Sequence, residues 1–132
     1  MNKESKITYK SCFINICSLI SDAIVSLEKT GMQICIVVSD KNELLGTITD
    51  GDIRRGLLEG YTVESKAKEI MSSRPMVVNN DMTLSEALKL MRLNLIRHLP
   101  VVDDKNVVVN LHMLDQITPV EKKENVVVIM AG

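Results

Sequence analysis

The sequence is poor in aromatic residues and in clustered charge. It has no tryptophan, and its aromatic residues are Tyr9, Phe13 and Tyr61, so the core must be built from aliphatic side chains and methionine. The 16 basic and 17 acidic residues give a net charge of −1 with no basic block, which argues against a nucleic-acid surface. No apolar run approaches the roughly 18 residues of a membrane span, and residues 1–6 lack the apolar run of a signal peptide. We therefore expect a cytoplasmic protein without nucleic-acid or membrane partners.

Metal-binding and catalytic patterns are also missing. Cys12, Cys17 and Cys35 show no Cys-x-x-Cys spacing, and the only histidines are His98 and His112. A metal site is not expected, and we predict reduced, mostly buried cysteines, as in a cytosolic protein. No Ser/His/Asp or Cys/His set has a convincing spacing, so no catalysis is expected from this chain itself.

An internal repeat is the main positive feature of the 132 residues. Residues 15–53 match residues 79–117 with a period of 64, and nine of the 39 pairs are identical, against about two or three expected by chance. Two copies of one small unit, neither able to bury a core alone, are predicted to pack about a pseudo-two-fold axis with two related clefts. We divide the chain into repeat 1 (1–60), a connector (61–74), repeat 2 (75–119), and a charged linker with an apolar strand (120–132).

Each copy is predicted to have the order β-α-β-β-α, an α+β (α/β) fold. In repeat 1 we expect strands at 12–14, 34–38 and 44–49, a helix on the apolar stripe that starts at Ile20, a helix stop at Gly31, and a closing helix over 51–60. In repeat 2 we expect strands at 76–78, 98–102 and 107–111, a helix capped by Thr83 and Glu86, and a closing helix that ends before Pro119. In the connector, Ile70-Met71 is expected to anchor against the body, and the eight methionines are expected in the core.

The loop from Thr49 to Arg54 is the leading candidate for a binding site. It joins a strand to a helix, so free N–H groups and the positive end of a helix dipole point out of it. Thr49 offers a hydroxyl for a phosphate, and Gly51 permits a tight turn or the close approach of a ligand. Asp52 offers a carboxylate for two ribose hydroxyls, while Arg54 and the arginine after it can neutralise phosphate charge. The alternative is structural: Thr49 or Asp50 is a helix cap and Asp52 a favourable first-turn acid.

The repeat helps to choose between these alternatives. At the offset of 64, the loop changes from Gly46 to Asn110, from Thr49 to Met113, and from Asp52 to Gln116. Residues needed only for structure should be present in both copies, so the second site is predicted to be degenerate. His98, with the arginine before it, is a weaker candidate for a phosphate contact, because a single histidine at a strand start is more often a surface group.

The closing helices are expected to form a homodimer interface. They carry more apolar surface than one small module can cover, and the residues concerned are Ile53, Leu57, Leu58, Leu114 and Ile117.

Three segments together resemble a CBS-domain pair, also called a Bateman module, over about residues 7–119. They are Leu-Gly-Thr-Ile-Thr-Asp-Gly-Asp-Ile-Arg-Arg (45–55), Glu-Ile-Met-Ser-Ser-Arg-Pro (69–75) and Ile-Arg-His-Leu-Pro-Val-Val-Asp (96–103). The resemblance implies a regulatory module whose Gly-x-x-Thr-x-x-Asp pattern holds an adenosine-type nucleotide (AMP, ADP or ATP). Thr49 would then bind phosphate or ribose and Asp52 the ribose hydroxyls, while the base would lie on main chain near Phe13–Asn15 and Ile34–Ile36.

The last residues, Met130-Ala131-Gly132, are similar to the start of the Met-Ala-Gly-Gly-x-Gly-x-Arg-Leu signature of sugar-phosphate nucleotidyltransferases. With the apolar strand before them, they imply that the module regulates an attached transferase that activates a sugar 1-phosphate. Two alternatives stay open. Similar loops occur in sugar-phosphate isomerases, where the CBS pair ends the chain, and the module could be a structural dimerisation unit with a vestigial nucleotide site.

Overall fold

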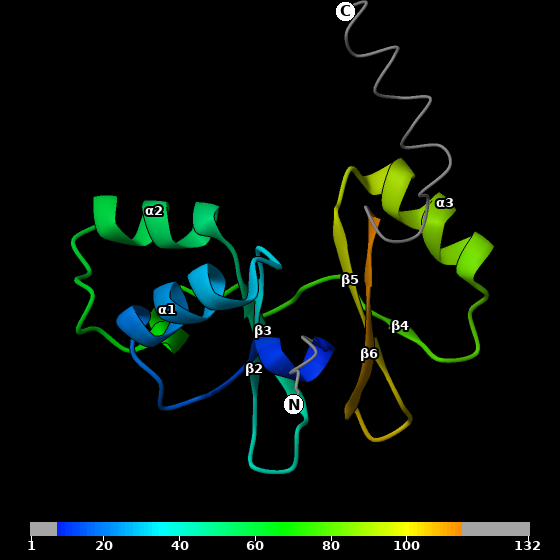
Figure 1. The fold of residues 1–132 in the computed structure, drawn as a ribbon, viewed down its shortest axis with the longest axis horizontal. Coiled ribbons are helices and arrows are strands. Elements are labelled where there is room, and N and C mark those ends of the chain that lie inside the picture. The colour runs from blue at the N-terminus through cyan, green and yellow to red at the C-terminus, as the bar shows by residue number, and fades with distance from the viewer. Residues whose placement is uncertain (1–7, 115–132) are drawn as a thin grey trace, which may run out of the picture. The chain divides into compact units, whose positions relative to one another are not determined.

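The computed structural model describes residues 8–114, and these form two compact units. Within the described residues, the first unit comprises residues 8–75 together with Lys105–Val108, and the second comprises Met76–Asp104 and residues 109–114. Each is a mixture of helices and a small sheet (Figure 1), which confirms the predicted α+β class. Across residues 8–114, no helix has the length and apolar character needed to span a membrane.

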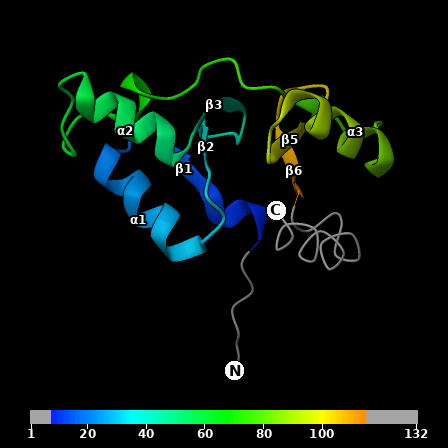
Figure 2. The same cartoon turned by 90° about the horizontal axis from the view of Figure 1, so that it is seen from above.

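The first unit places both of its α-helices on one side of a three-stranded sheet (Figures 1 and 2). Strands β1 and β2 are parallel, and β2 and β3 are antiparallel, in the order β1-β2-β3. The elements within its described residues are η1 (Tyr9–Cys12), β1 (Phe13–Asn15), α1 (Ile20–Thr30), β2 (Cys35–Val38), β3 (Leu44–Ile48), α2 (Asp50–Leu58) and η2 (Ala67–Glu69).

The second copy repeats this plan in β4 (Val78–Asn79), α3 (Leu84–Asn94), β5 (His98–Val102) and β6 (Val108–Met113), with the sheet order β4-β5-β6. The strand register confirms the period of 64, because Ile14 faces Val37 in the first sheet and Val78 faces Val101 in the second. The closing helix predicted for this copy lies beyond Leu114 and outside the described residues, as do residues 120–132.

The starts and stops of α1 and α3 have the same physical cause in both copies. Asp22 accepts a hydrogen bond from the backbone N–H three residues before it (2.8 Å), and Glu86 does the same from Thr83 (2.9 Å). Thr83 accepts in return from the N–H of Glu86 (3.1 Å), which confirms the predicted capping box. The bond from the Thr83 backbone N–H to the Glu86 carboxylate lowers the pKa of Glu86. Gly31 ends α1 at φ +68°, as predicted, and Leu95 ends α3 at φ +57°.

The core of the first unit is aliphatic, as the lack of aromatic residues predicts. Cys12 and Cys35 are fully buried, but Cys17 is exposed. Ile53 is also buried, because it faces the sheet from the first turn of α2, so its assignment to a dimer surface is wrong. The buried core residues of this unit are Ile20, Ala23, Cys35, Val37, Ile48, Ile53 and Ala67.

The connector after α2 packs directly on the first unit. Thr47 and Ser72 exchange two backbone hydrogen bonds (3.0 and 2.8 Å), so the connector pairs with β3. A Cβ atom on Gly46 would lie 2.7 Å from the Ser72 carbonyl oxygen, and one on Gly56 would lie 2.4 Å from the Ile70 side chain. Both glycines are therefore required by the connector, and the anchoring predicted for Ile70-Met71 is confirmed.

The turn Lys105–Val108 belongs to the first unit because it pairs with the β2–β3 turn. Leu44 donates its N–H to the Asn106 carbonyl (2.9 Å), and Val108 donates to the Asn42 carbonyl (3.0 Å). Asn42 and Asn106 both have positive φ, +65° and +68°, which asparagine tolerates better than most residues. The turn predicted over residues 40–42 is confirmed.

The first strand of each copy is misplaced in the prediction. Cys12 belongs to η1, and β1 begins at Phe13. In the second copy the apolar run 76–78 is not the strand, because β4 is Val78–Asn79 and Met76 is 40% exposed. The exposure of Met76 also contradicts the expectation that all the methionines lie in the core. Parallel pairing with β2 or β5, rather than the apolar run itself, sets where these short strands lie.

Candidate functional site

The candidate site lies where β3 ends and α2 begins. Thr49 is extended (φ −120°, ψ 174°) and occupies the N-cap position, and Asp50 is the first helical residue. The first N–H groups of an α-helix have no partner within the helix, and the helix dipole places partial positive charge on them. The sequence-predicted loop therefore has the backbone environment of an anion site.

Asp52 is tied into this turn by both carboxylate oxygens. Its Oδ2 accepts from the Thr49 backbone N–H (2.9 Å) and from the Thr49 hydroxyl (3.2 Å), while its Oδ1 pairs with the Arg55 guanidinium. The residue is only 9% exposed. The structural alternative is thus realised, because Asp52 returns a capping bond to Thr49. A carboxylate offers about four acceptor positions and three are occupied here, so the two vicinal hydroxyls of a ribose must share or replace one of these bonds.

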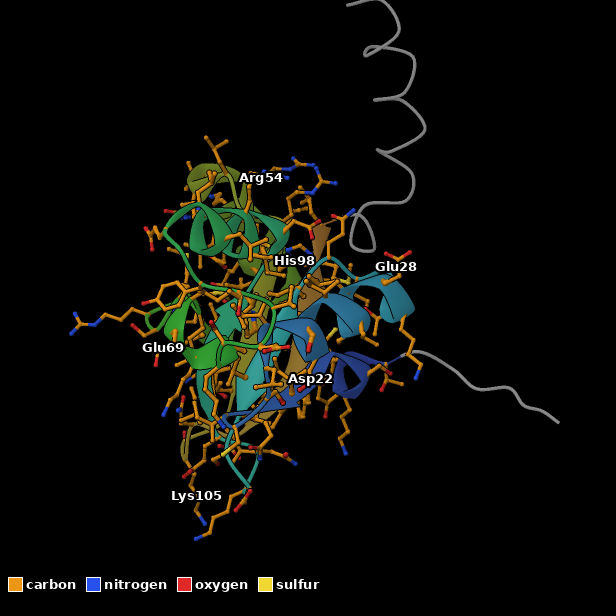
Figure 3. All side chains as sticks on the ribbon, turned by 90° about the vertical axis from the view of Figure 1, so that its left-hand side faces the viewer. Asp22, Glu28, Arg54, Glu69, His98 and Lys105 are labelled. Atoms are coloured by element: carbon orange, nitrogen blue, oxygen red, sulfur yellow. The ribbon has the colours of Figure 1, made fainter. Side chains whose placement is uncertain are left out.

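In this turn two acidic residues are followed by two basic residues. Asp50 is exposed, and Arg54 is exposed on the next turn of α2, where Figure 3 shows its side chain at the surface. The Arg55 side chain is 68% exposed although it pairs with Asp52. The two acids stabilise the helix start but repel a phosphate, and the two arginines offset that repulsion. The pairing of Arg55 with Asp52 was not singled out from sequence, although the i, i+3 spacing is its signal.

Gly51 does not form a tight turn. It lies in the first turn of α2, and only Gly31 and Gly60 have positive φ among the described glycines. A Cβ atom on Gly51 would lie 3.5 Å from Arg55 Nη1 and 3.7 Å from Thr49 Oγ1, which are ordinary contacts. The tight-turn expectation is therefore wrong, and the close approach of a ligand stays a prediction.

The strand register brings the predicted base-binding segments partly together with Thr49. Thr47 faces Ile36, which faces Phe13, so the end of β3 and the starts of β2 and β1 share one edge of the sheet. Ile34 immediately precedes β2 at this edge and is 3% exposed, and Ile36 is fully buried. The side chains of both isoleucines are closed to a ligand, and Ile36, in the middle strand of the sheet, is closed as a whole residue.

Asn15 is not brought to this edge. It faces Val38, which faces Leu44, at the opposite end of the sheet from Thr49. Its Oδ1 accepts from the Cys17 N–H (2.7 Å), and its Nδ2 donates to Asp40 (3.4 Å). These contacts give Asn15 a local role at the β1–α1 turn.

The remaining candidates lie in the second unit. His98 is half-buried as the first residue of β5. His112 is half-buried in β6, and burial lowers its pKa. Met113, at the position equivalent to Thr49, is half-buried at the end of β6 and cannot donate a hydrogen bond. Gln116 lies outside the described residues. Within residues 8–114, no group of three or more His, Cys, Asp or Glu side chains is arranged to hold a metal ion.

Comparison with known sequences identifies both copies. The CBS domain family matches residues 18–59 and again residues 67–111. An uncharacterized protein of Helicobacter pylori J99 is 37% identical over 97 residues, which are 73% of this chain and 30% of that protein. A probable arabinose 5-phosphate isomerase of Haemophilus influenzae is 37% identical over 93 residues, 69% of this chain and 27% of that protein. The chain thus spans less than a third of the length of these relatives.

Solved structures share the fold at lower identity. Staphylococcus aureus OpuCA has a TM-score of 0.73 at 21% identity, over 90% of this chain and 98% of that chain. CBSX2 in complex with AMP has a TM-score of 0.71 at 19% identity, over 86% and 88%. The cytosolic domain of the Mg²⁺ channel MgtE in complex with ATP has a TM-score of 0.68 at 20% identity, over 82% and 44%. With its two family matches and its repeated β-α-β-β plan, this chain belongs to the CBS domain family.

Proposed function

We propose that this CBS pair is a regulatory module that binds one adenosine-type nucleotide at the start of α2 and controls an attached enzyme. The observation that carries the proposal is the Thr49–Asp52 turn, where a hydroxyl, a carboxylate and the N-terminal end of α2 converge at one sheet edge. The AMP complex of CBSX2 and the ATP complex of MgtE support a nucleotide as the ligand class.

The roles of the residues follow from their chemistry. Asp52 accepts from the ribose hydroxyls, and Thr49 donates its hydroxyl to ribose or phosphate. Arg54 and the N–H groups of the first turn of α2 offset the phosphate charge. The base lies against main chain near Phe13 and Ile34, since the Ile34 side chain is buried. The second copy, with Met113 and Gln116 in place of Thr49 and Asp52, binds no specific nucleotide.

Calorimetric titration of the chain with AMP, ADP, ATP and cytidine and guanosine nucleotides tests the proposal. One adenine nucleotide should bind per chain, and at a hundredfold excess over Kd it should stabilise the module by about 2.7 kcal/mol. A stoichiometry of two equivalent nucleotides would contradict the degenerate second site. If no nucleotide at millimolar concentration raises the melting temperature, the sensing function is wrong.

Substitution at Asp52 separates ligand binding from capping. Asp52→Ala should weaken nucleotide binding by about 1.5–3 kcal/mol, or roughly ten- to a hundredfold. It should also destabilise the free chain by about 1 kcal/mol, because a capping bond is lost. Asp22→Ala is the matched control, since Asp22 makes the equivalent bond at the start of α1 (Figure 3). It should reduce stability alike and leave the affinity unchanged. Thr49→Val should cost only about 1 kcal/mol of binding.

The attached enzyme is proposed to be a sugar-1-phosphate nucleotidyltransferase. The support is the similarity of Met130-Ala131-Gly132 to the start of the transferase signature. The match to the Haemophilus isomerase favours a different sugar-phosphate enzyme. The full-length protein should release pyrophosphate from a nucleoside triphosphate and a sugar 1-phosphate. Isomerisation of a sugar phosphate without pyrophosphate release would select the alternative. Regulation requires that the bound nucleotide changes the rate of the transferase or isomerase reaction. The coupling free energy between the two sites is then expected to be about 1–3 kcal/mol.

A structural dimerisation role is the second candidate function. Exposed apolar side chains on α1 and α2 favour it, since Val25 is 59% exposed and Leu58 is 82% exposed. Leu57, at 42%, adds to this surface, whereas Ile53 does not. We expect a dimer by light scattering at micromolar concentration, and Leu58→Glu should shift it to monomer. A wild-type chain that is strictly monomeric would contradict this role.

A further inference from the structure

The ion pair between Asp52 and Arg55 occupies the carboxylate oxygen that a ribose would need. Asp52 Oδ2 already accepts two hydrogen bonds from Thr49, at 2.9 and 3.2 Å. Oδ1 is the less occupied oxygen, and Arg55 contacts it. Oδ1 has about one acceptor position left, so a ribose that places both of its vicinal hydroxyls on this oxygen has to displace the guanidinium.

We propose that Arg55 competes with the ribose for Asp52 in the free protein and is transferred to the ligand phosphate on binding, so that the site selects nucleotides over nucleosides. This inference rests on the proposed function, because it concerns the same nucleotide site. It assigns to Arg55 a specificity role distinct from the general positive charge of its neighbour Arg54.

Breaking the Asp52–Arg55 ion pair costs the protein little stability. The Arg55 side chain is 68% exposed, whereas the Asp52 side chain is 11% exposed. An ion pair with one partner mostly in water is screened and contributes little to stability. The released guanidinium stays on the first turns of α2, beside the N–H groups that attract a phosphate. There it can form the paired hydrogen bonds that a planar guanidinium makes with phosphate oxygens.

The exchange of Arg55 from Asp52 to the ligand is favourable only when the ligand carries a phosphate. A nucleotide replaces the Asp52–Arg55 contact with two contacts, one from ribose to Asp52 and one from phosphate to Arg55. A nucleoside removes the same ion pair and gives Arg55 no new partner. Arg54 cannot take the same part, because residues two apart on a helix do not face each other, and Arg54 is two residues from Asp52.

The test measures the Kd of AMP and of adenosine for the full chain and for two single variants by calorimetry. Arg55→Gln removes the charge and keeps most of the aliphatic stem. It should weaken AMP binding by about ten- to a hundredfold and strengthen adenosine binding by about two- to fivefold. Arg54→Gln is the matched control. It should weaken AMP by only a few fold and leave adenosine unchanged.

The two outcomes for adenosine distinguish this inference from the proposed function. If wild type binds AMP but adenosine binds Arg55→Gln no tighter than wild type, the exchange is wrong while the nucleotide site stands. An equal loss of AMP affinity in both arginine variants would also overturn it. If wild type binds neither AMP nor any other nucleotide, the proposed function itself fails. A melting curve of each free variant verifies that it is folded, and because both arginines are exposed, we expect melting temperatures near that of wild type.

Discussion

The substitution Gly51→Ala tests the ligand contact without removing any native side-chain bond. Gly51 lies in the first turn of α2, and an added Cβ atom meets Arg55 Nη1 at 3.5 Å and Thr49 Oγ1 at 3.7 Å. Neither distance requires a neighbour to move. Alanine in a helix is favoured over glycine by about 0.5–1 kcal/mol. The free variant should therefore be as stable as wild type or more stable, with a melting temperature higher by about 2–5 °C.

Ligand binding should change in the opposite direction. If the nucleotide approaches the backbone at Gly51, the new methyl group occupies part of its space. Overpacking of this kind costs about 1–3 kcal/mol, which corresponds to a loss of roughly five- to 150-fold in affinity. Thermal melting of the free chain and calorimetry with AMP measure the two effects separately.

A higher melting temperature together with a weaker AMP affinity in Gly51→Ala would show that the ligand contacts the backbone at Gly51. Leu58→Ala, near the other end of α2 and 82% exposed, is the control and should leave the AMP affinity unchanged. A stable Gly51→Ala variant that binds AMP like wild type would show that the ligand does not approach this turn. A variant of lower stability would contradict the helical geometry assigned to Gly51.

Three further predictions concern stability and reactivity. Leu95→Gly should stabilise the chain by about 1 kcal/mol in urea unfolding, because Leu95 is 90% exposed and has positive φ. Gly31→Ala should destabilise the chain by a similar amount, because Gly31 also has positive φ. Equal unfolding free energies of wild type and the two variants would contradict this. Ellman's reagent at pH 8 should titrate only Cys17 in the folded chain. Burial raises the thiol pKa of Cys35 and raises that of Cys12 to about 12. More than one reactive thiol would be evidence against the burial of these two cysteines. Burial lowers the pKa of His112, so the unfolded chain binds a proton there more readily than the folded chain. The free energy of unfolding should therefore fall as the pH drops below about 6.5. An equal fall in His112→Gln would show that another group causes it.

Sequence predicted the helices and hairpins well because their signals are local. The capping acid Glu86, the turn at Asn42 and the helix stop at Gly31 each act within a few residues, and the structure confirms all three. Strand β5 agrees with the predicted range 98–102 for the same reason, since every residue after its half-buried first residue is buried.

Features that depend on pairing between distant segments could not be predicted in this way. Strands β1 and β4 are too short to carry a pattern, and their limits come from partners in β2 and β5. The CBS resemblance implies that the base lies near Phe13–Asn15, but the strand register places Asn15 at the far end of the sheet from Thr49. The apolar content of the closing helix predicts an exposed Ile53, but this side chain packs into the core of the first unit.

The loop residues that differ between the two copies do not all differ for the same reason. Gly46 is required because the connector approaches it closely, and the Ser72 carbonyl would lie 2.7 Å from a Cβ atom there. Its change to asparagine in the second copy therefore needs no ligand to explain it. The difference between Gly46 and Asn110 is therefore not evidence for a binding site in the first copy.

Thr49 and Asp52 differ between the copies for another reason. A capping acid that serves structure alone is kept across the repeat, because Asp22 at the start of α1 corresponds to Glu86 at the start of α3, and both accept from the N–H three residues earlier. Asp52 makes the same kind of bond, at 2.9 Å, yet its counterpart is glutamine. Glutamine can still accept a capping bond, so what the second copy has lost at this position is the negative charge. Capping does not require this charge, which lies on a side chain only 9% exposed and is paired with the exposed Arg55. Its loss in the second copy therefore supports the ribose site proposed for the first.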